Sequence, residues 1–560
     1  MEMRVFGLLV PLMRERISGR IFKGPMPARE DCMIDVFIAA IPILFLVVAM
    51  TAKKGIPAVV AFPIAALIAY ASRVFFFGTD SSLAQAAVVA GLLNALTPIS
   101  IVFGAILFFV AMEKSGAMDV VRDWLRGISS NRIAQVMVVA WSFQFLIEGA
   151  SGFGTPAALA APILVGLGFP PLRVVVVCLV MNSVPVSFGA VGTPTWFGFG
   201  ALGLDEESLR TIAVQTALFN GFAALFVPAA ALLFIAGRRE VLENLVFVYL
   251  SIFASVSPMI AFAAVNYEFP AVVGGVIGLF VTIVLARMGI GLKKSGESRE
   301  PLAASPGVKV LFRALLPLAA TVAILLVTRI PALPFRAWLT SPAPWRTVSL
   351  DPLGELSISR TLVVRWSNIL GEDLTWTHAL LYVPSFIPFF VAAALAYHLF
   401  AAKGSGAGEI FAQTAHRIRG PVLALFGALV FVQLLIIDGE NASTMIIGTA
   451  LAGGTGEGWR FIAPFLGALG SFFSGSNTIS NLTFGGIQAS IAANSGLNPH
   501  TILALQSAGG AMGNMVCIHN IVAVCAVLGI RRSEGKILKK TVRPLLLYGA
   551  ALAVAVAVGI

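Results

Sequence analysis

The sequence predicts an all-α polytopic membrane protein with about 12–14 transmembrane helices, arranged as two inverted repeats that contain re-entrant or broken helices. Three observations support this fold class. Apolar residues make up 58% of the 560 residues and charged residues only 12%, whereas a soluble domain has roughly 25% charged residues. Long apolar runs recur along the whole chain, and glycine-rich polar stretches interrupt them in both halves.

Residues 1–32 are expected to form a basic N-terminal arm. The apolar run from Val5 to Met13 is too short to span a bilayer, and five basic residues follow it before position 30. It also lacks a small-residue cleavage site, so an interfacial position is expected rather than a removable signal peptide.

The apolar runs divide into two transmembrane repeats, expected at 33–290 and 309–560, because residues 291–308 are polar and glycine-rich and predict a linker. In the first repeat the expected spans are 34–51, 56–77, 86–112, 133–147, 172–190, 211–236, 244–265 and 270–289. In the second they are 309–328, 379–401, 420–437, 442–453, 461–473, 501–529 and 542–559.

Basic residues set the expected orientation in the cytoplasmic membrane. The net charge of +11 comes mainly from basic residues in short loops between apolar runs. The positive-inside rule predicts such residues in cytoplasmic loops. The expected partner of these charges is therefore membrane lipid and not nucleic acid. The linker is then cytoplasmic, and residues 329–376 form an extracytoplasmic loop. Its four tryptophans are typical of a segment near the headgroup region.

Cysteine usage indicates neither disulfides nor a metal. The four cysteines, Cys32, Cys178, Cys517 and Cys525, all fall in or beside apolar runs. Such cysteines behave as small buried hydrophobic residues, and no metal-ligand spacing occurs. No cofactor is expected.

The breaks in the apolar runs form two matched pairs. A glycine-rich break at 148–156 is followed by a second at 182–194, and a break at 474–481 is followed by one at 506–520. Irregular backbone at membrane depth is tolerated only where it lines a protein-enclosed cavity. Paired breaks in the two halves of a chain therefore predict a binding site at the interface of two repeats.

The chemistry of these breaks favours a small carboxylate. Thr155 and Thr193 each precede a proline, which suggests an N-cap hydroxyl at the start of a half-helix, and Ser476 could cap a third start. Converging helix N-termini attract a negative charge without a buried arginine. The expected substrate-binding residues are Ser151, Gly152, Gly154, Thr155, Asn182, Ser183, Thr193, Ser474, Gly475, Ser476, Asn477, Thr478, Asn481, Gln506 and Asn514.

Two titratable residues are candidates for coupling to an ion gradient. Glu148 follows an apolar run, where a carboxylate is costly unless it is neutralised or paired, so it could load and release a proton. Its structural alternative is a cap on the following half-helix. His519 could titrate near neutral pH or serve as a hydrogen-bonded packing residue.

Close helix packing is the general alternative for the breaks, since glycine and other small residues also serve that purpose in membranes. Four breaks in two matched pairs, each with several amides or hydroxyls, favour a site.

The first pair of breaks, 145–169 and 182–194, resembles the signature of the L-lactate permease family, and residues 470–481 with Gln488 and 509–520 resemble its second signature. The resemblance covers most of the chain. It implies a secondary transporter, and not an enzyme, that imports L-lactate, glycolate or a similar monocarboxylate with protons. The Ser-Asn-Thr triplet at 476–478 is also similar to sites of sodium-coupled carboxylate carriers, so sodium remains an alternative ion.

This chain departs from the family pattern at two positions. Asn477 stands where the resemblance implies Asp, and Asn514 where it implies Lys. Losing both partners of a buried pair is far less costly than losing one. If that Asp contributes to proton coupling in the family, Glu148 or His519 must do so here, or the driving ion differs.

Other classes of membrane protein find less support. An ATP-driven pump needs a phosphate-binding loop, and the sequence contains no such motif. Five scattered histidines offer little to a membrane-embedded enzyme. A channel could also use re-entrant loops, and it would be distinguished from a carrier by the absence of gradient-driven accumulation.

Overall fold

The computed structural model describes residues 29–51, 56–152, 155–293, 307–328, 333–383, 385–400, 406–530 and 533–560. Helices dominate these ranges, as predicted. The helices before the linker are α2 (Arg29–Thr51), α3 (Ala58–Ala71), α4 (Ser81–Lys114), α5 (Ala117–Arg126), α6 (Arg132–Val136), α7 (Gln144–Ser151), α8 (Thr155–Gly166), α9 (Pro171–Met181), α10 (Gly189–Trp196), α11 (Glu206–Ala224), α12 (Val227–Leu232), α13 (Arg238–Glu243), α14 (Leu245–Ala263) and α15 (Pro270–Met288).

The linker region ends where α16 begins, and most of it, 294–306, lies outside the described residues. The later helices are α16 (Val308–Val327), α17 (Phe335–Leu339), α18 (Phe390–Phe400), α19 (Ala407–Ile436), α20 (Ser443–Thr455), α21 (Trp459–Ser474), α22 (Asn477–Asn494), α23 (Pro499–Asn514), α24 (Ile518–Val527) and α25 (Glu534–Ala557). Of the expected N-terminal arm, 1–28 also lies outside the described residues, and Arg29 already begins α2.

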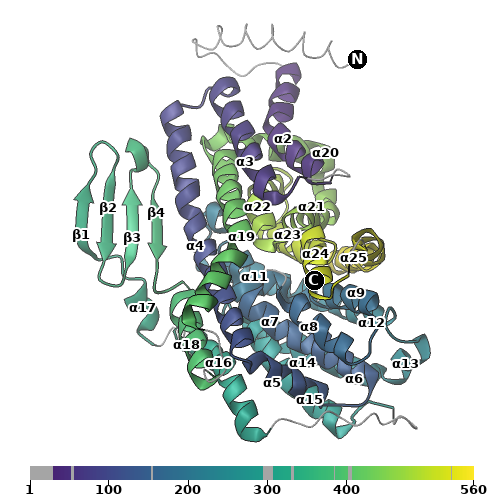
Figure 1. Ribbon diagram of the computed structural model, residues 1–560. Coiled ribbons are helices and arrows are strands. Elements are labelled where there is room, and N and C mark those ends of the chain that lie inside the picture. The colour runs from purple at the N-terminus through teal and green to yellow at the C-terminus, as the bar shows by residue number, and fades with distance from the viewer. Residues whose placement is uncertain are drawn as a thin grey trace.

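The predicted spans coincide mainly with these helices. By length and composition, seven helices in the described ranges could cross a membrane, and the bent pair Pro171–Met181 and Val184–Leu202, at 43°, could make an eighth. Several other predicted spans are shorter or interrupted helices, which agrees with the broken helices expected from the glycine-rich stretches. The segments form an elongated bundle in which α4 and α19 run beside each other, although their sequences lie in different halves (Figure 1).

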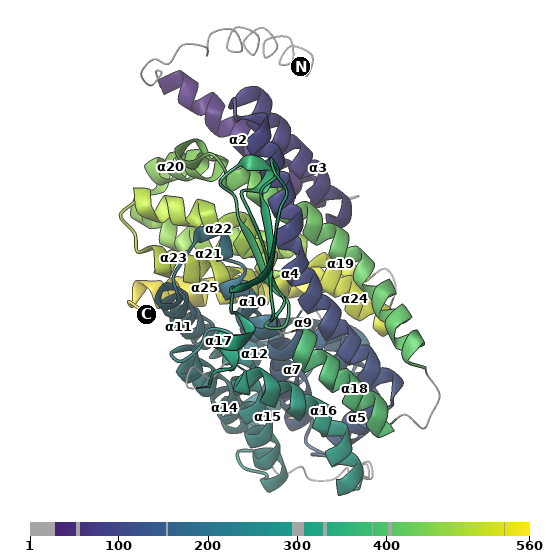
Figure 2. The same cartoon turned by 90° about the vertical axis from the view of Figure 1, so that its left-hand side faces the viewer.

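The segment expected to be an extracytoplasmic loop contains a small antiparallel sheet that projects from the bundle beside α4 (Figures 1 and 2). Its strands pair in the order β1-β2-β3-β4. Trp376 of β4 packs with Ile369 against Ala86 and Ala90 of α4. The strands are β1 (Pro344–Ser349), β2 (Glu355–Ser359), β3 (Val363–Ser367) and β4 (Trp376–Ala379).

A buried ion pair joins the two halves near the end of α3. Arg73, whose side chain is 1% exposed, donates to Asp438 Oδ2 at 2.5 Å and to the Asn441 carbonyl at 2.7 Å. Thr79 donates to the same carboxylate oxygen at 2.9 Å. A buried arginine needs such partners, because burying an unpaired charge costs several kcal/mol.

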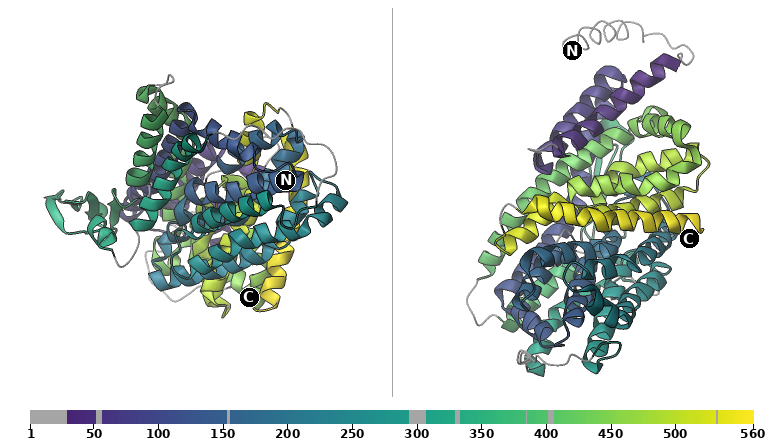
Figure 3. Two further views of the ribbon diagram at one scale, coloured as in Figure 1. Left: turned by 90° about the horizontal axis from the view of Figure 1, so that it is seen from below. Right: turned by 90° about the vertical axis from the view of Figure 1, so that its right-hand side faces the viewer.

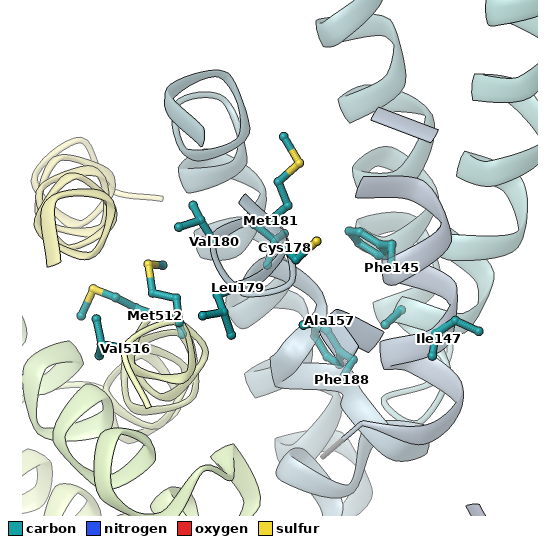
Figure 4. Close-up of a cluster of buried hydrophobic side chains, with 14 of the residues drawn as sticks. Phe145, Ile147, Ala157, Cys178, Leu179, Val180, Met181, Phe188, Met512 and Val516 are labelled. Carbon is teal, nitrogen blue, oxygen red and sulfur yellow. The ribbon is translucent and has the colours of Figure 1, made fainter. Parts of the chain in front are cut away.

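The core around the breaks is apolar and crosses between the halves. Leu179 and Val180 of α9 lie opposite Met512 and Val516 of the second half, while Phe145 lies on the α7 side of α9 (Figure 4). All five side chains are nearly inaccessible to solvent. Polar groups in this region are therefore enclosed by protein.

Candidate functional site

Each half contains two successive interrupted helices. In the first half, α7 is followed by α8, and α9 by the 3₁₀ segment Val184–Phe188 and then α10. In the second half, α21 is followed by α22, and α23 by α24. The four interruptions coincide with the four predicted breaks.

The first break places a buried carboxylate beside the second. Glu148, on α7, is 3% exposed, and its Oε2 accepts a hydrogen bond from Asn182 Nδ2 at 2.9 Å. Asn182 is the C-cap residue of α9. A Cβ on Gly189 would overlap Glu148 Oε1, so a side chain at this position would displace the carboxylate from where it lies. Glu148 is thus enclosed by both breaks of the first half.

The backbone after Gly189 is strained. Ala190, Val191 and Gly192 all have positive φ, at 46°, 60° and 66°. For a β-branched residue such as Val191 this is a genuine outlier, and strained backbone of this kind clusters at functional sites. Trp196 Nε1 donates to the Val191 carbonyl at 3.0 Å, which helps to hold the conformation.

The third break begins with a capped helix start. Ser476 is the N-cap of α22, and its hydroxyl accepts from the Ile479 amide at 3.3 Å, so the predicted cap is confirmed. Gly475 precedes it in the left-handed region at φ 72°. Ser474 donates to the Gly470 carbonyl at 2.7 Å and to the Ser476 carbonyl at 3.0 Å.

Asn477 connects the third break to both halves. Its Nδ2 donates to the Ser507 carbonyl at 2.9 Å and lies 3.4 Å from Ser187 Oγ. Ser187, from the second break, also donates to the Ser507 carbonyl at 3.0 Å. Asn220 Nδ2 donates to Ser187 Oγ at 2.9 Å. Second-half and first-half breaks therefore share one buried hydrogen-bond network.

A second connection lies one turn along α22. Asn481 Nδ2 donates to the Pro194 carbonyl at 2.9 Å. Gln506 Nε2 donates to Ser480 Oγ at 3.0 Å, and Gln488 Nε2 donates to Gln506 Oε1 at 2.8 Å. These amides are all buried. Glu148 and Asn182 thus form one hydrogen-bonded group and Asn477, Asn481 and Gln506 belong to a second, and the break at 182–194 contributes to both.

Some predicted residues have local roles instead. The Ser151 hydroxyl donates to the Ile147 carbonyl at 2.9 Å, and Ser183 donates to the Val180 carbonyl at 2.7 Å. The expected Thr193 cap is wrong in detail. The Thr193 carbonyl accepts from the Phe197 amide at 3.1 Å as at a helix start, but its hydroxyl donates to the Ala190 carbonyl. This bond fastens the strained turn.

The remaining predicted residues lie at the edges of the region or cannot be placed. Asn514 donates to the Gly475 carbonyl at 3.4 Å and accepts from Asn520 at 3.0 Å, while Thr478 is buried on α22. Gly152, at φ 60°, lies beside Glu148. Gly154 and the side chains of Thr155 and His519 lie outside the described part of the chain.

Several buried polar atoms in this region have no hydrogen-bond partner among the described residues. They include Asn182 Oδ1, Asn477 Oδ1 and Ser471 Oγ. Asn477 Oδ1 and Ser471 Oγ both lie against Gly510, where a Cβ would overlap the asparagine oxygen. Unpaired buried polar atoms are costly and are expected where a ligand or ion supplies the missing partner. Among the described residues, no cluster of three or more His, Cys, Asp or Glu side chains could hold a metal ion.

Interrupted helices with buried amides and a buried carboxylate, enclosed by apolar helices that can cross a bilayer, define a multi-pass membrane transport protein. The chain belongs to the L-lactate permease family, whose model matches residues 35–560. The proteins of this family are permeases and not enzymes, and they reside in the plasma membrane.

Individual relatives match nearly the full length. A provisionally named L-lactate permease of Haemophilus influenzae is 46% identical over 517 residues, covering 92% of this chain and 97% of its own. The glycolate permease GlcA of Escherichia coli is 25% identical over 549 residues, covering 93% and 95%. Among solved structures, the YdaH transporter of Alcanivorax borkumensis has 15% identity and a TM-score of 0.40, covering 84% of this chain and 87% of its own.

Sequence reasoning missed three participants in the site. Ser187 and Ser507 join the halves. Asn220 donates to Ser187, and its Oδ1 accepts a hydrogen bond from the Tyr548 hydroxyl at 2.8 Å. Their sequence signal was weak, because single serines and asparagines on apolar helices are common. Ser187 and Ser507 do fall inside the predicted breaks, which was the available clue.

Proposed function

We propose that this protein imports L-lactate or a related short 2-hydroxy-monocarboxylate such as glycolate across the cytoplasmic membrane by proton symport. The family and the names of its relatives support the substrate class. The observation that supports the mechanism is the enclosure of Glu148 by two breaks, one of which, 182–194, also bonds to Asn477 and Asn481 of the second half.

In this proposal the amides recognise the substrate. Asn182, Asn477, Asn481 and Gln506 offer both donors and acceptors to a carboxylate and its 2-hydroxyl group. The start of α22 at Asn477 adds the positive end of a helix dipole, which favours an anion. The site needs no buried cation, in agreement with asparagine at both 477 and 514.

Glu148 is the proposed proton carrier. A protonated carboxyl group is far cheaper to hold in an enclosed apolar region than a carboxylate. Asn182 Nδ2 stabilises the charged form by one hydrogen bond, so the group can exist in both states during a transport cycle. Proton loading on one side and release on the other would then accompany carboxylate movement.

The decisive experiment compares Glu148→Gln with wild type in proteoliposomes. If one proton accompanies each monocarboxylate, a pH about one unit lower outside the vesicles than inside supports about tenfold accumulation of lactate, because one pH unit is worth ~1.4 kcal/mol. The glutamine variant keeps an oxygen that can accept from Asn182 but cannot carry a proton. We expect its accumulation ratio to fall to about one, while lactate counterflow continues.

Glu207→Gln is the matched control, because Glu207 is an exposed residue in the first turn of α11. It removes the same charge and should accumulate lactate like wild type. Normal pH-driven accumulation by Glu148→Gln would refute the proposed proton carrier.

Sodium symport is the second candidate. Asn477 Oδ1 and Ser471 Oγ are buried neutral oxygens without hydrogen-bond partners in the described residues, and hard cations prefer oxygen ligands. The same vesicles under a sodium gradient at equal pH separate the two. Accumulation driven by the sodium gradient alone would show that sodium, and not the proton, is the coupled ion.

A further inference from the structure

A basic cavity lies on the outside of the bundle, away from the buried site. It has a volume of about 420 Å³ and is formed between α9, the end of α12 and α25. Its lining combines four cations with three apolar side chains: Lys536, Lys539, Lys540, Arg543, Leu172, Phe234 and Ile537. The α25 helix runs along the surface of the molecule, as the yellow helix in the right-hand view of Figure 3 shows.

The four cations share one face of α25. Their spacing of three or four residues places Lys536, Lys539 or Lys540, and Arg543 along a single ridge. All four are exposed, and no carboxylate among the described residues forms an ion pair with any of them. The four positive charges therefore repel one another when no anion is bound.

The position of the row on the helix adds to its positive potential. Lys536 lies in the first turn of α25, where the helix dipole disfavours a cation. The same dipole favours an anion at this end. The first turn also carries one acid, Glu534, so the preference of the cavity for negative charge comes mainly from the four cations that line it.

The ridge changes from basic to apolar along α25. Beyond Arg543 its exposed residues include Leu546, at 57%, and Val554, at 50%. From Arg543 to Val554 the helix rises by roughly 16 Å, about half the ~30 Å hydrocarbon thickness of a bilayer. This arrangement matches an amphiphile with a negative head and a long apolar tail. A free anion would make no use of the apolar half.

We propose that this cavity binds the phosphate headgroup of an anionic phospholipid, with its acyl chains along Leu546 and Val554. Lys536, Lys539 and Lys540 fall between the expected spans 501–529 and 542–559, and a basic loop between spans is expected in the cytoplasm, where anionic lipids attract basic segments close to the membrane. The lipid would hold α25 against α9 and α12. This site is independent of the proposed ion coupling.

The first test uses wild-type protein in mild detergent and native mass spectrometry. We expect phosphatidylglycerol to bind with at least about tenfold higher affinity than phosphatidylcholine, because only the former carries net negative charge at its headgroup. Equal retention of the two lipids would overturn the proposal. Displacement of phosphatidylglycerol by an equal concentration of inorganic phosphate would also overturn it and would indicate a free-anion site.

The second test removes the charges. The variant Lys539→Gln/Lys540→Gln/Arg543→Gln should lose at least about tenfold in phosphatidylglycerol affinity. Its control is Arg346→Gln/Arg360→Gln/Arg365→Gln, which removes the same charge from exposed residues of the small sheet. Unchanged lipid binding by the first variant, or an equal loss in the control, would contradict the assigned site.

Discussion

The pair formed by Arg73 and Asp438 predicts an unequal response to loss of either partner. Arg73 is 1% exposed, whereas the Asp438 side chain is 28% exposed. Replacing Asp438 by Asn leaves a buried guanidinium without its counter-charge. Replacing Arg73 by Met leaves a carboxylate that water can still reach. Loss of the acid should therefore cost more stability than loss of the base.

The expected magnitudes follow from this difference in exposure. Breaking a buried ion pair costs about 3–5 kcal/mol. We expect Asp438→Asn near the upper end of that range and Arg73→Met near the lower end or below it. Asn tolerates the left-handed backbone of Asp438, at φ 79°, so the change mainly removes charge. The double variant leaves no buried charge and should lose less than Asp438→Asn alone.

Reversible unfolding in mixed micelles, by a detergent-denaturant titration, measures the free energy of unfolding of the wild type, the two single variants and the double variant. The double-mutant cycle then gives the interaction between the two residues, which we expect to be at least about 2 kcal/mol. Two results would refute the reasoning: Arg73→Met less stable than Asp438→Asn, or single effects that add in the double variant. The first would show that exposure does not set the cost of losing each partner, and the second that the two residues do not interact.

Two further predictions concern the glycine beside Glu148 and the docked sheet. Gly189→Ala should reduce lactate uptake at least about tenfold, because the new Cβ would displace the Glu148 carboxylate from its contact with Asn182. Gly200→Ala, which adds a Cβ in open space, is the control, and equal activity of the two variants would contradict the close contact. Burial lowers the pKa of His378, whose Nδ1 lies 2.9 Å from Thr97 Oγ1, so the folded state resists protonation. Docking of the sheet should be strongest above about pH 6.5 and weaken below it. Amide hydrogen exchange at residues 344–379, corrected at each pH for the base-catalysed exchange rate of an unstructured peptide, should then show lower protection factors at about pH 5.5 than at about pH 8. His378→Gln should abolish that difference, and equal protection at the two pH values in wild type would refute the role of His378.

The sequence was sufficient for the fold class because apolar runs and glycine-rich breaks depend on local composition. The helix start at Ser476 was predictable for the same reason, since a cap is a contact within four residues. The breaks at 148–156 and 474–481 could be located from their glycines and polar residues alone. Their inverted relationship remains a prediction.

Contacts between distant segments could not be predicted in this way. No local pattern indicates that Arg73 meets Asp438, or that Asn481 meets the Pro194 carbonyl. The small sheet was missed for a different reason. Strands are recognised from sequence chiefly by alternating apolar and polar residues. Every residue of β1 is exposed, so burial of one face does not impose that alternation on this strand.

The strained turn after Gly189 explains how the two proposed roles can depend on each other. At one end Gly189 lies against the Glu148 carboxylate, and at the other the Pro194 carbonyl accepts from Asn481 of the second half. Between them, Ala190 and Val191 occupy the left-handed region at a cost of about 1–3 kcal/mol each. Such strain persists only where the surrounding contacts hold it, so the contacts with Glu148 and Asn481 act on the same short segment. We therefore expect movement of Glu148 on proton release to displace the contact between Asn481 and the Pro194 carbonyl.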